Sequence, residues 1–190
     1  IRTSWRYLGW RGHCGDIEYA WNRTSDVGQD GLHDFGALYV SCSNAGYTRI
    51  HHNLIEGVGN NPNNAGIYLD VFVDGAEIHH NLSLDMPPER FLYRLSRGWV
   101  VLVMSINTKI FDNWTDQLSY RDFDQGRYRF FWHDRTNRRT NNTLIRDRAL
   151  LPPGAAEVVE QAGLEPGHRH LRQEVDALAS LTARQGEQQP

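Results

Sequence analysis

The sequence contains one lysine, two cysteines and no long hydrophobic run, and each shortage limits what the protein can be. No apolar stretch approaches the roughly 18 residues that a membrane-spanning helix needs, so we expect no membrane partner. Cys14 and Cys42 are too few and too far apart for a cysteine-based metal site, and we expect neither metal nor cofactor. The formal net charge of -3 argues against nucleic acid as a partner.

The chain also lacks a long helical period over most of its length. It shows short apolar or alternating runs broken by Gly, Asn, Asp and Ser, a pattern typical of β-strands. Such runs occupy residues 36–40, 66–70, 99–104 and 128–132. Their β-branched and aromatic side chains favour strands over pairs of helices.

What the sequence does contain is a repeat. The tetrapeptide Ile-His-His-Asn occurs at residues 50–53 and again at residues 78–81. Weaker copies place asparagines at positions 22, 53, 81, 113 and 142, in steps of 31, 28, 32 and 29 residues. Self-similarity at a period of about 20 to 50 residues indicates a solenoid. The paired histidines recur beside the asparagines, and we expect them to be structural.

About 30 residues hold two or three short strands with their turns, which is one coil of a parallel β-helix. We therefore predict an all-β fold: a right-handed single-stranded parallel β-helix of about five coils over residues 1–148. The handedness follows from the strong bias of parallel crossover connections. The repeated asparagines would stack at one turn and bond their amides to one another, since coils lie about 4.8 Å apart. Asparagine also tolerates the left-handed backbone of a tight turn.

The two ends of the predicted solenoid differ. The chain opens at Ile1, without a methionine and already inside strand-like sequence, so we expect it to be continuous with further N-terminal coils. Residues 149–190 are predicted to form a C-terminal helical cap and a polar tail, with helical spacing at 155–161 and 171–184. Such a helical piece would cover the exposed edge of the last coil.

The strand-like segment 66–73 carries the candidate chemistry. Its aliphatic side chains alternate and must point into the coil, which leaves Tyr68, Asp70 and Phe72 on the outer surface. One coil earlier, Tyr39 also points outward and can stack over Tyr68. Aromatic rings stack on sugar faces and carboxylates perform acid and base chemistry, so this row suits a carbohydrate groove.

Two elements of the chain resemble a known superfamily. These are His-Asp-Phe-Gly-Ala-Leu-Tyr at residues 33–39 and Gly-Ile-Tyr-Leu-Asp at 66–70, each followed by Ile-His-His-Asn. They resemble the pectin-lyase-like right-handed β-helix superfamily, and within it bacterial β-helix glycoside hydrolases of the fucosidase and xylanase type. Those proteins carry an Asp-x-Gly-Ala-Ile-Tyr element followed one coil later by Gly-Ile-Tyr-Leu-Asp.

The resemblance implies a carbohydrate-active protein that cleaves glycosidic bonds of a polysaccharide or oligosaccharide with a carboxylate pair. Carried over position by position, Asp70 and Asp34 are the candidate catalytic residues. Tyr39, Tyr68 and His33 are the candidate substrate-binding residues. The resemblance also implies a secreted or periplasmic location.

Two other interpretations stay open. A polysaccharide lyase or uronate epimerase needs a base and a cation that neutralises the substrate acid, and arginines could serve. The candidates are Arg94, Arg97, Arg127 and Arg129. A non-catalytic β-helix could bind sugar through the same outward row without turning it over. A hydrolase further requires a turn that folds Asp34 back toward Asp70, because the two stand several residues apart along the strand direction.

Overall fold

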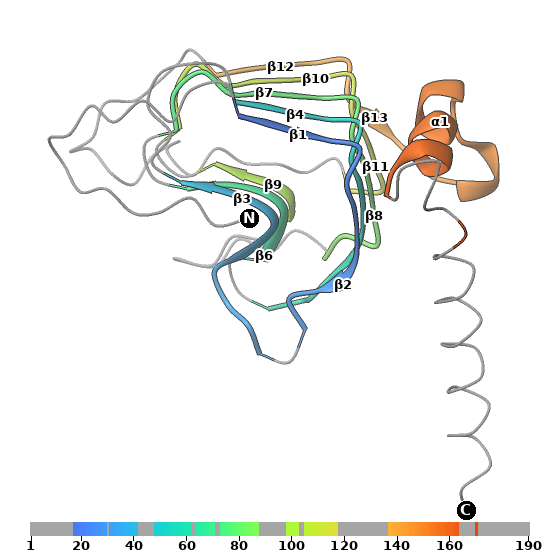
Figure 1. The fold of residues 1–190 in the computed structure, drawn as a ribbon, viewed down its shortest axis with the longest axis horizontal. Helices are drawn as coiled ribbons and strands as arrows, with labels where there is room; N and C mark the ends of the chain where they lie inside the picture. Colours follow the sequence, from blue (N-terminus) through green and yellow to red (C-terminus); the bar gives the residue numbers. More distant parts are fainter. Residues whose placement is uncertain are drawn as a thin grey trace, which may run out of the picture.

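In the part of the chain that the structure describes, a computed structural model, the protein forms three parallel β-sheets with one short α-helix packed beside them (Figure 1). The structure describes residues 17–29, 31–41, 48–61, 64–70, 73–87, 98–102, 105–117, 137–163 and 170. The expected strand at 128–132, both cysteines, Phe72 and the four candidate arginines lie outside these residues.

The first two sheets each contain five described strands. The order in the first is β1-β4-β7-β10-β12, formed by Glu18–Ala20, Arg49–His51, Glu77–His79, Lys109–Phe111 and Arg138–Thr140. The order in the second is β13-β11-β8-β5-β2, formed by Thr143–Leu144, Trp114–Thr115, Leu82–Leu84, Leu54–Val58 and Arg23–Val27. The third sheet, β3-β6-β9, consists of Phe35–Ser41, Asn64–Asp70 and Gly98–Leu102.

The sequence repeat is also the structural repeat. Neighbouring strands pair in parallel across one repeat, so that Tyr19 lies beside Ile50, Ile50 beside Ile78, and Ile78 beside Ile110. Each repeat thus adds one strand to the first sheet and one to the second. The arrangement is mostly parallel β-sheet, and it is consistent with a parallel β-helix.

The predicted stack of asparagines is confirmed. The Nδ2 of Asn53 donates to Oδ1 of Asn81 at 2.8 Å, and Nδ2 of Asn81 donates to Oδ1 of Asn113 at 2.9 Å. Asn22 and Asn142 extend this ladder at its two ends. The three central members are fully buried.

The position of the left-handed backbone differs from the expectation. In all five repeats it falls on the residue before the ladder asparagine: Trp21, His52, His80, Asp112 and Asn141. The backbone N–H of every ladder asparagine except Asn142 donates to Oδ1 of the next asparagine. Because this N–H must face the next repeat, the chain turns one residue earlier.

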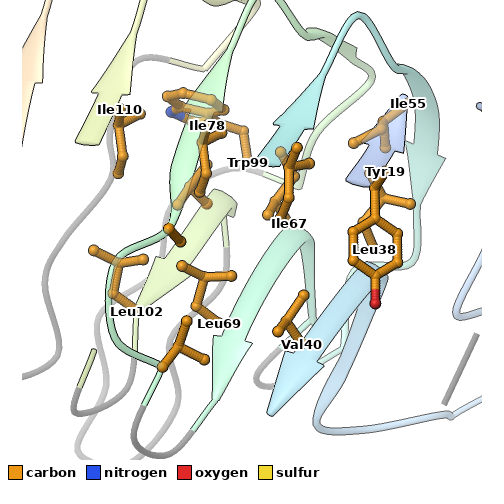
Figure 2. Close-up of a cluster of buried hydrophobic side chains, with 14 of the residues drawn as sticks. Tyr19, Leu38, Val40, Ile55, Ile67, Leu69, Ile78, Trp99, Leu102 and Ile110 are labelled. Carbon is orange, nitrogen blue, oxygen red and sulfur yellow. The ribbon is translucent and has the colours of Figure 1, made fainter. Parts of the chain in front are cut away.

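The core lies between the three sheets and is filled by side chains that recur in register (Figure 2). Ile67 and Leu69 of β6 are fully buried in it, as the alternation of that strand predicted. Trp99 of β9 and the isoleucine row of the first sheet pack against them. Full burial of one such aliphatic side chain stabilises the fold by about 1.5 to 3 kcal/mol.

The short helix predicted at 155–161 is confirmed. Helix α1, Pro153–Gln161, packs against the outer face of the second sheet, beside β8 and β11 (Figure 1). Its Ala155 and Val158 are fully buried there. The physical reason is that the second sheet presents Leu54, Leu82 and Leu84 on this face, and these apolar side chains need cover. The second helical piece expected at 171–184 lies outside the described residues.

Candidate functional site

Tyr39 of β3 and Tyr68 of β6 are paired neighbours in the third sheet, as predicted. Their ring centroids are 5.1 Å apart, but the planes meet at 77°, an edge-to-face contact instead of the expected stack. Edge-to-face packing places the positive edge of one ring on the negative face of the other, which is favourable for aromatic pairs.

Each tyrosine hydroxyl binds a candidate catalytic carboxylate. The hydroxyl of Tyr39 donates to Oδ2 of Asp70, and that of Tyr68 donates to Oδ1 of Asp34 at 2.8 Å. We call these four residues the Tyr–Asp group. Both bonds cross between β6 and the segment that begins at Asp34, so two sequence elements about 30 residues apart meet in one site.

Local backbone features explain how Asp34 reaches Tyr68. Asp34 has a φ of 57°, so the chain turns sharply just before β3 begins. Gly36 follows, and a Cβ there would lie 2.6 Å from the Cβ of Tyr68. The missing side chain at Gly36 therefore lets Tyr68 lie across β3 toward Asp34.

The burial of the group corrects one expectation. Asp70 is only 6% exposed and Tyr68 only 4%, although both point away from the core between the sheets. Tyr68 packs with Ala65, Val101 and Tyr39 in a second, smaller apolar cluster. Strand alternation predicts which face a side chain occupies, but not what covers that face. Tyr68 is therefore not an open platform for a sugar ring.

The candidate residues that precede β3 are exposed to solvent. Asp34 and His33 are exposed, and Tyr39 is half-buried. Among the described contacts none joins His33 to the Tyr–Asp group. Asp34 is therefore the carboxylate of this group that a dissolved ligand can reach directly.

The electrostatics make Tyr68 a permanent hydrogen-bond donor. Burial raises the pKa of Tyr68 strongly, and the charge of Asp70, the hydrogen bond to Asp34 and the charge of Asp34 raise it further. Both carboxylates thus act on the same hydroxyl group, which indicates that both lie near it.

A second cluster surrounds the turn beside the ladder. In the sequence, only the repeated His-His dipeptide indicated this cluster. His51 stacks on His79 with ring centroids 4.9 Å apart, and His52 stacks on His80 at 5.1 Å. The Nδ1 atoms of His51 and His52 are 2.8 Å apart, and those of His79 and His80 are 2.9 Å apart. We call these residues the four-histidine cluster. Nε2 of His51 also contacts Oε1 of Glu18 at 2.8 Å.

Two members of this cluster resist protonation. Burial, together with the charges of His51, His80 and His52, lowers the pKa of His79 to about 4. Burial also lowers the pKa of His52, as do its neighbours His51 and His80. These two imidazoles are therefore neutral at pH 7.

The described residues contain no group of three or more side chains placed to hold a metal ion, and no helix among them is long and apolar enough to cross a membrane. No family model, curated protein or solved structure matches the chain. A functional assignment therefore depends on the residues and contacts of the two clusters.

Proposed function

We propose that the chain is a right-handed parallel β-helix of about five coils, of the pectin-lyase-like superfamily, that hydrolyses glycosidic bonds in a polysaccharide or oligosaccharide. The observation that supports this most is the Tyr–Asp group. It gathers the two carboxylates singled out by the resemblance around a pair of tyrosine hydroxyls. A protein acting on such substrates would be secreted or periplasmic.

The two carboxylates lie in different environments, and glycoside hydrolysis depends on such a difference. One carboxyl group must donate a proton to the leaving oxygen, and the other must act as a base or a nucleophile. Enzymes separate these roles by giving the two groups unlike surroundings. Asp70 is buried, which disfavours its charged form and suits the general acid, whereas Asp34 is exposed and suits the base or nucleophile.

The test is a glycan hydrolysis assay on the wild type, Asp70→Asn and Asp34→Asn, with melting temperature as the check on folding. Each substitution keeps the shape of the side chain and removes its charge. We expect turnover to fall by about 100- to 10,000-fold in both variants, because each loses one proton-transfer group. Glu160→Gln on helix α1 removes an exposed carboxylate far from the group along the chain and should keep full turnover. Full turnover in Asp70→Asn would contradict the proposal.

The burial of Asp70 and Tyr68 supports a second candidate, a sugar-binding β-helix that catalyses nothing. A wild-type protein that is retained on a glycan affinity gel, and yet releases no reducing ends from a broad panel, would favour this candidate. Products with the ultraviolet absorbance of an unsaturated uronate would instead indicate a lyase.

A further inference from the structure

Helix α1 is held on the second sheet by contacts near both of its ends, and each contact involves a tryptophan. After the C-terminal end, the N–H of Gly163 donates to the carbonyl oxygen of Trp21 at 2.7 Å. In the first turn, Gly154 packs against the indole ring of Trp114, where an added Cβ would lie 2.7 Å from a ring carbon. Both tryptophans are next to a ladder asparagine: Trp21 lies in the turn before Asn22, and Trp114 begins β11 directly after Asn113.

Two members of the four-histidine cluster connect these tryptophans. His52 stacks on Trp21 with ring centroids 4.4 Å apart, at an interplanar angle of 26°. Its other face stacks on His80, which meets the ring of Trp114 edge-on at 5.8 Å. A displacement of either imidazole therefore moves a residue that positions α1.

We propose that the four-histidine cluster is an acid-sensitive switch that releases helix α1 from the second sheet when its imidazoles gain protons. Each Nδ1–Nδ1 contact holds one proton, so a pair with both rings protonated has two N–H groups facing each other and loses its hydrogen bond. The stacked rings would then carry like charges about 5 Å apart, which repel.

Three carboxylates oppose this repulsion. They are Glu18 on β1, Glu77 on β7 and Glu157 on α1; Arg49 and Lys109 pair with the first two. Glu157 favours the charged form of His52, but burial and the neighbouring histidines outweigh it and lower the pKa.

The sign of the pH dependence follows from these pKa values. His52 and His79 have pKa values below the ordinary 6.5 while the helix is docked, so the docked state binds fewer protons than the released state. Docking is therefore favoured above about pH 6.5 and weakens as the pH falls toward about 4.

Release would expose an apolar surface of defined position. Leu54, Leu82 and Leu84 are buried in one apolar cluster with Ala155 and Val158 of α1. A nine-residue helix is not stable alone in water, so its amides should lose protection once it leaves the sheet.

The test is hydrogen exchange of the amides in residues 153–163 between about pH 8 and pH 4, corrected for the intrinsic exchange rate, together with binding of a dye that reports apolar surface. In the wild type we expect protection to fall at least about tenfold while the strands of the first sheet remain protected. The double variant His52→Gln, His80→Gln should show a smaller step, because the two imidazoles that contact Trp21 and Trp114 can no longer gain protons.

Glu157→Gln is the matched variant of opposite sign, and it changes only an exposed side chain. It removes an attractive partner of protonated His52, so α1 should release at a higher pH than in the wild type. Two results would overturn the proposal: α1 amides that stay protected until the whole protein unfolds, or a Glu157→Gln midpoint at or below that of the wild type. The release midpoint of Glu157→Gln tests the proposal even if the double histidine variant does not fold.

Discussion

Replacing Asn81 by alanine is expected to lower the free energy of unfolding by about 3 kcal/mol or more. Asn81 is fully buried at the centre of the ladder. Its Nδ2 donates to Asn113 and to the carbonyl oxygen of Ile50, and its Oδ1 accepts from both the backbone N–H and the Nδ2 of Asn53. Alanine would leave several of these buried groups without partners, and each orphaned group costs about 1 to 3 kcal/mol.

Chemical denaturation of the wild type, Asn81→Ala and Asn22→Ala measures this effect. Asn22 is at the end of the ladder and is exposed, so its loss should cost about 1 kcal/mol. Similar losses in the two variants would show that the ladder contributes no more in its buried centre than at its edge. Asn81→Asp retains the acceptor oxygen but buries a charge, and it should be destabilised at least as much as the alanine variant.

Replacing Gly59 by alanine should cost about 3 kcal/mol, because the new methyl group has no room. A Cβ at Gly59 would lie well under 3.0 Å from the carbonyl oxygen of Gly28, one repeat earlier. That oxygen cannot move freely, since it accepts hydrogen bonds from Asn61 and Asn64. Two successive repeats would therefore have to separate at this turn, or the turn would have to rebuild.

Gly31→Ala is the matched control for this prediction. Gly31 has a φ of +79°, so alanine is strained there, but a Cβ would meet no atom within 4 Å. Backbone strain alone should cost about 1 to 2 kcal/mol. Thermal unfolding of both variants separates steric overlap from backbone strain. A Gly59→Ala variant no less stable than Gly31→Ala would contradict the close approach of the two repeats.

The parts of the fold that recur were predictable together with their packing, whereas for the helix, which occurs once, only its presence was predictable. The ladder requires the same residue in every repeat, so Asn22, Asn53 and Asn81 appear at nearly equal spacing in the sequence. The alternation of Ile67 and Leu69 likewise showed which face of β6 is internal. Helix α1 was predicted as a helix, but its amphipathic pattern does not say which apolar surface it covers.

The candidate site shows the same division. The sequence alone indicated Asp34, Asp70, Tyr39 and Tyr68 as one set, placed Tyr39 beside Tyr68, and required that a turn fold Asp34 back. It did not show that the hydroxyls bind the carboxylates crosswise, because this depends on the φ of Asp34 and the space over Gly36. Nor did it show that Tyr68 and Asp70 are buried.

The amino-acid sequence by itself therefore determined the repeat, the strand pairing and the identity of the stacked residues, because parallel strands in register place equivalent positions side by side. Only the tertiary structure decided which side chains are covered, where α1 lies, and that four histidines stack into one cluster. These properties arise from contacts between segments distant in sequence, and neither local spacing nor composition records such contacts.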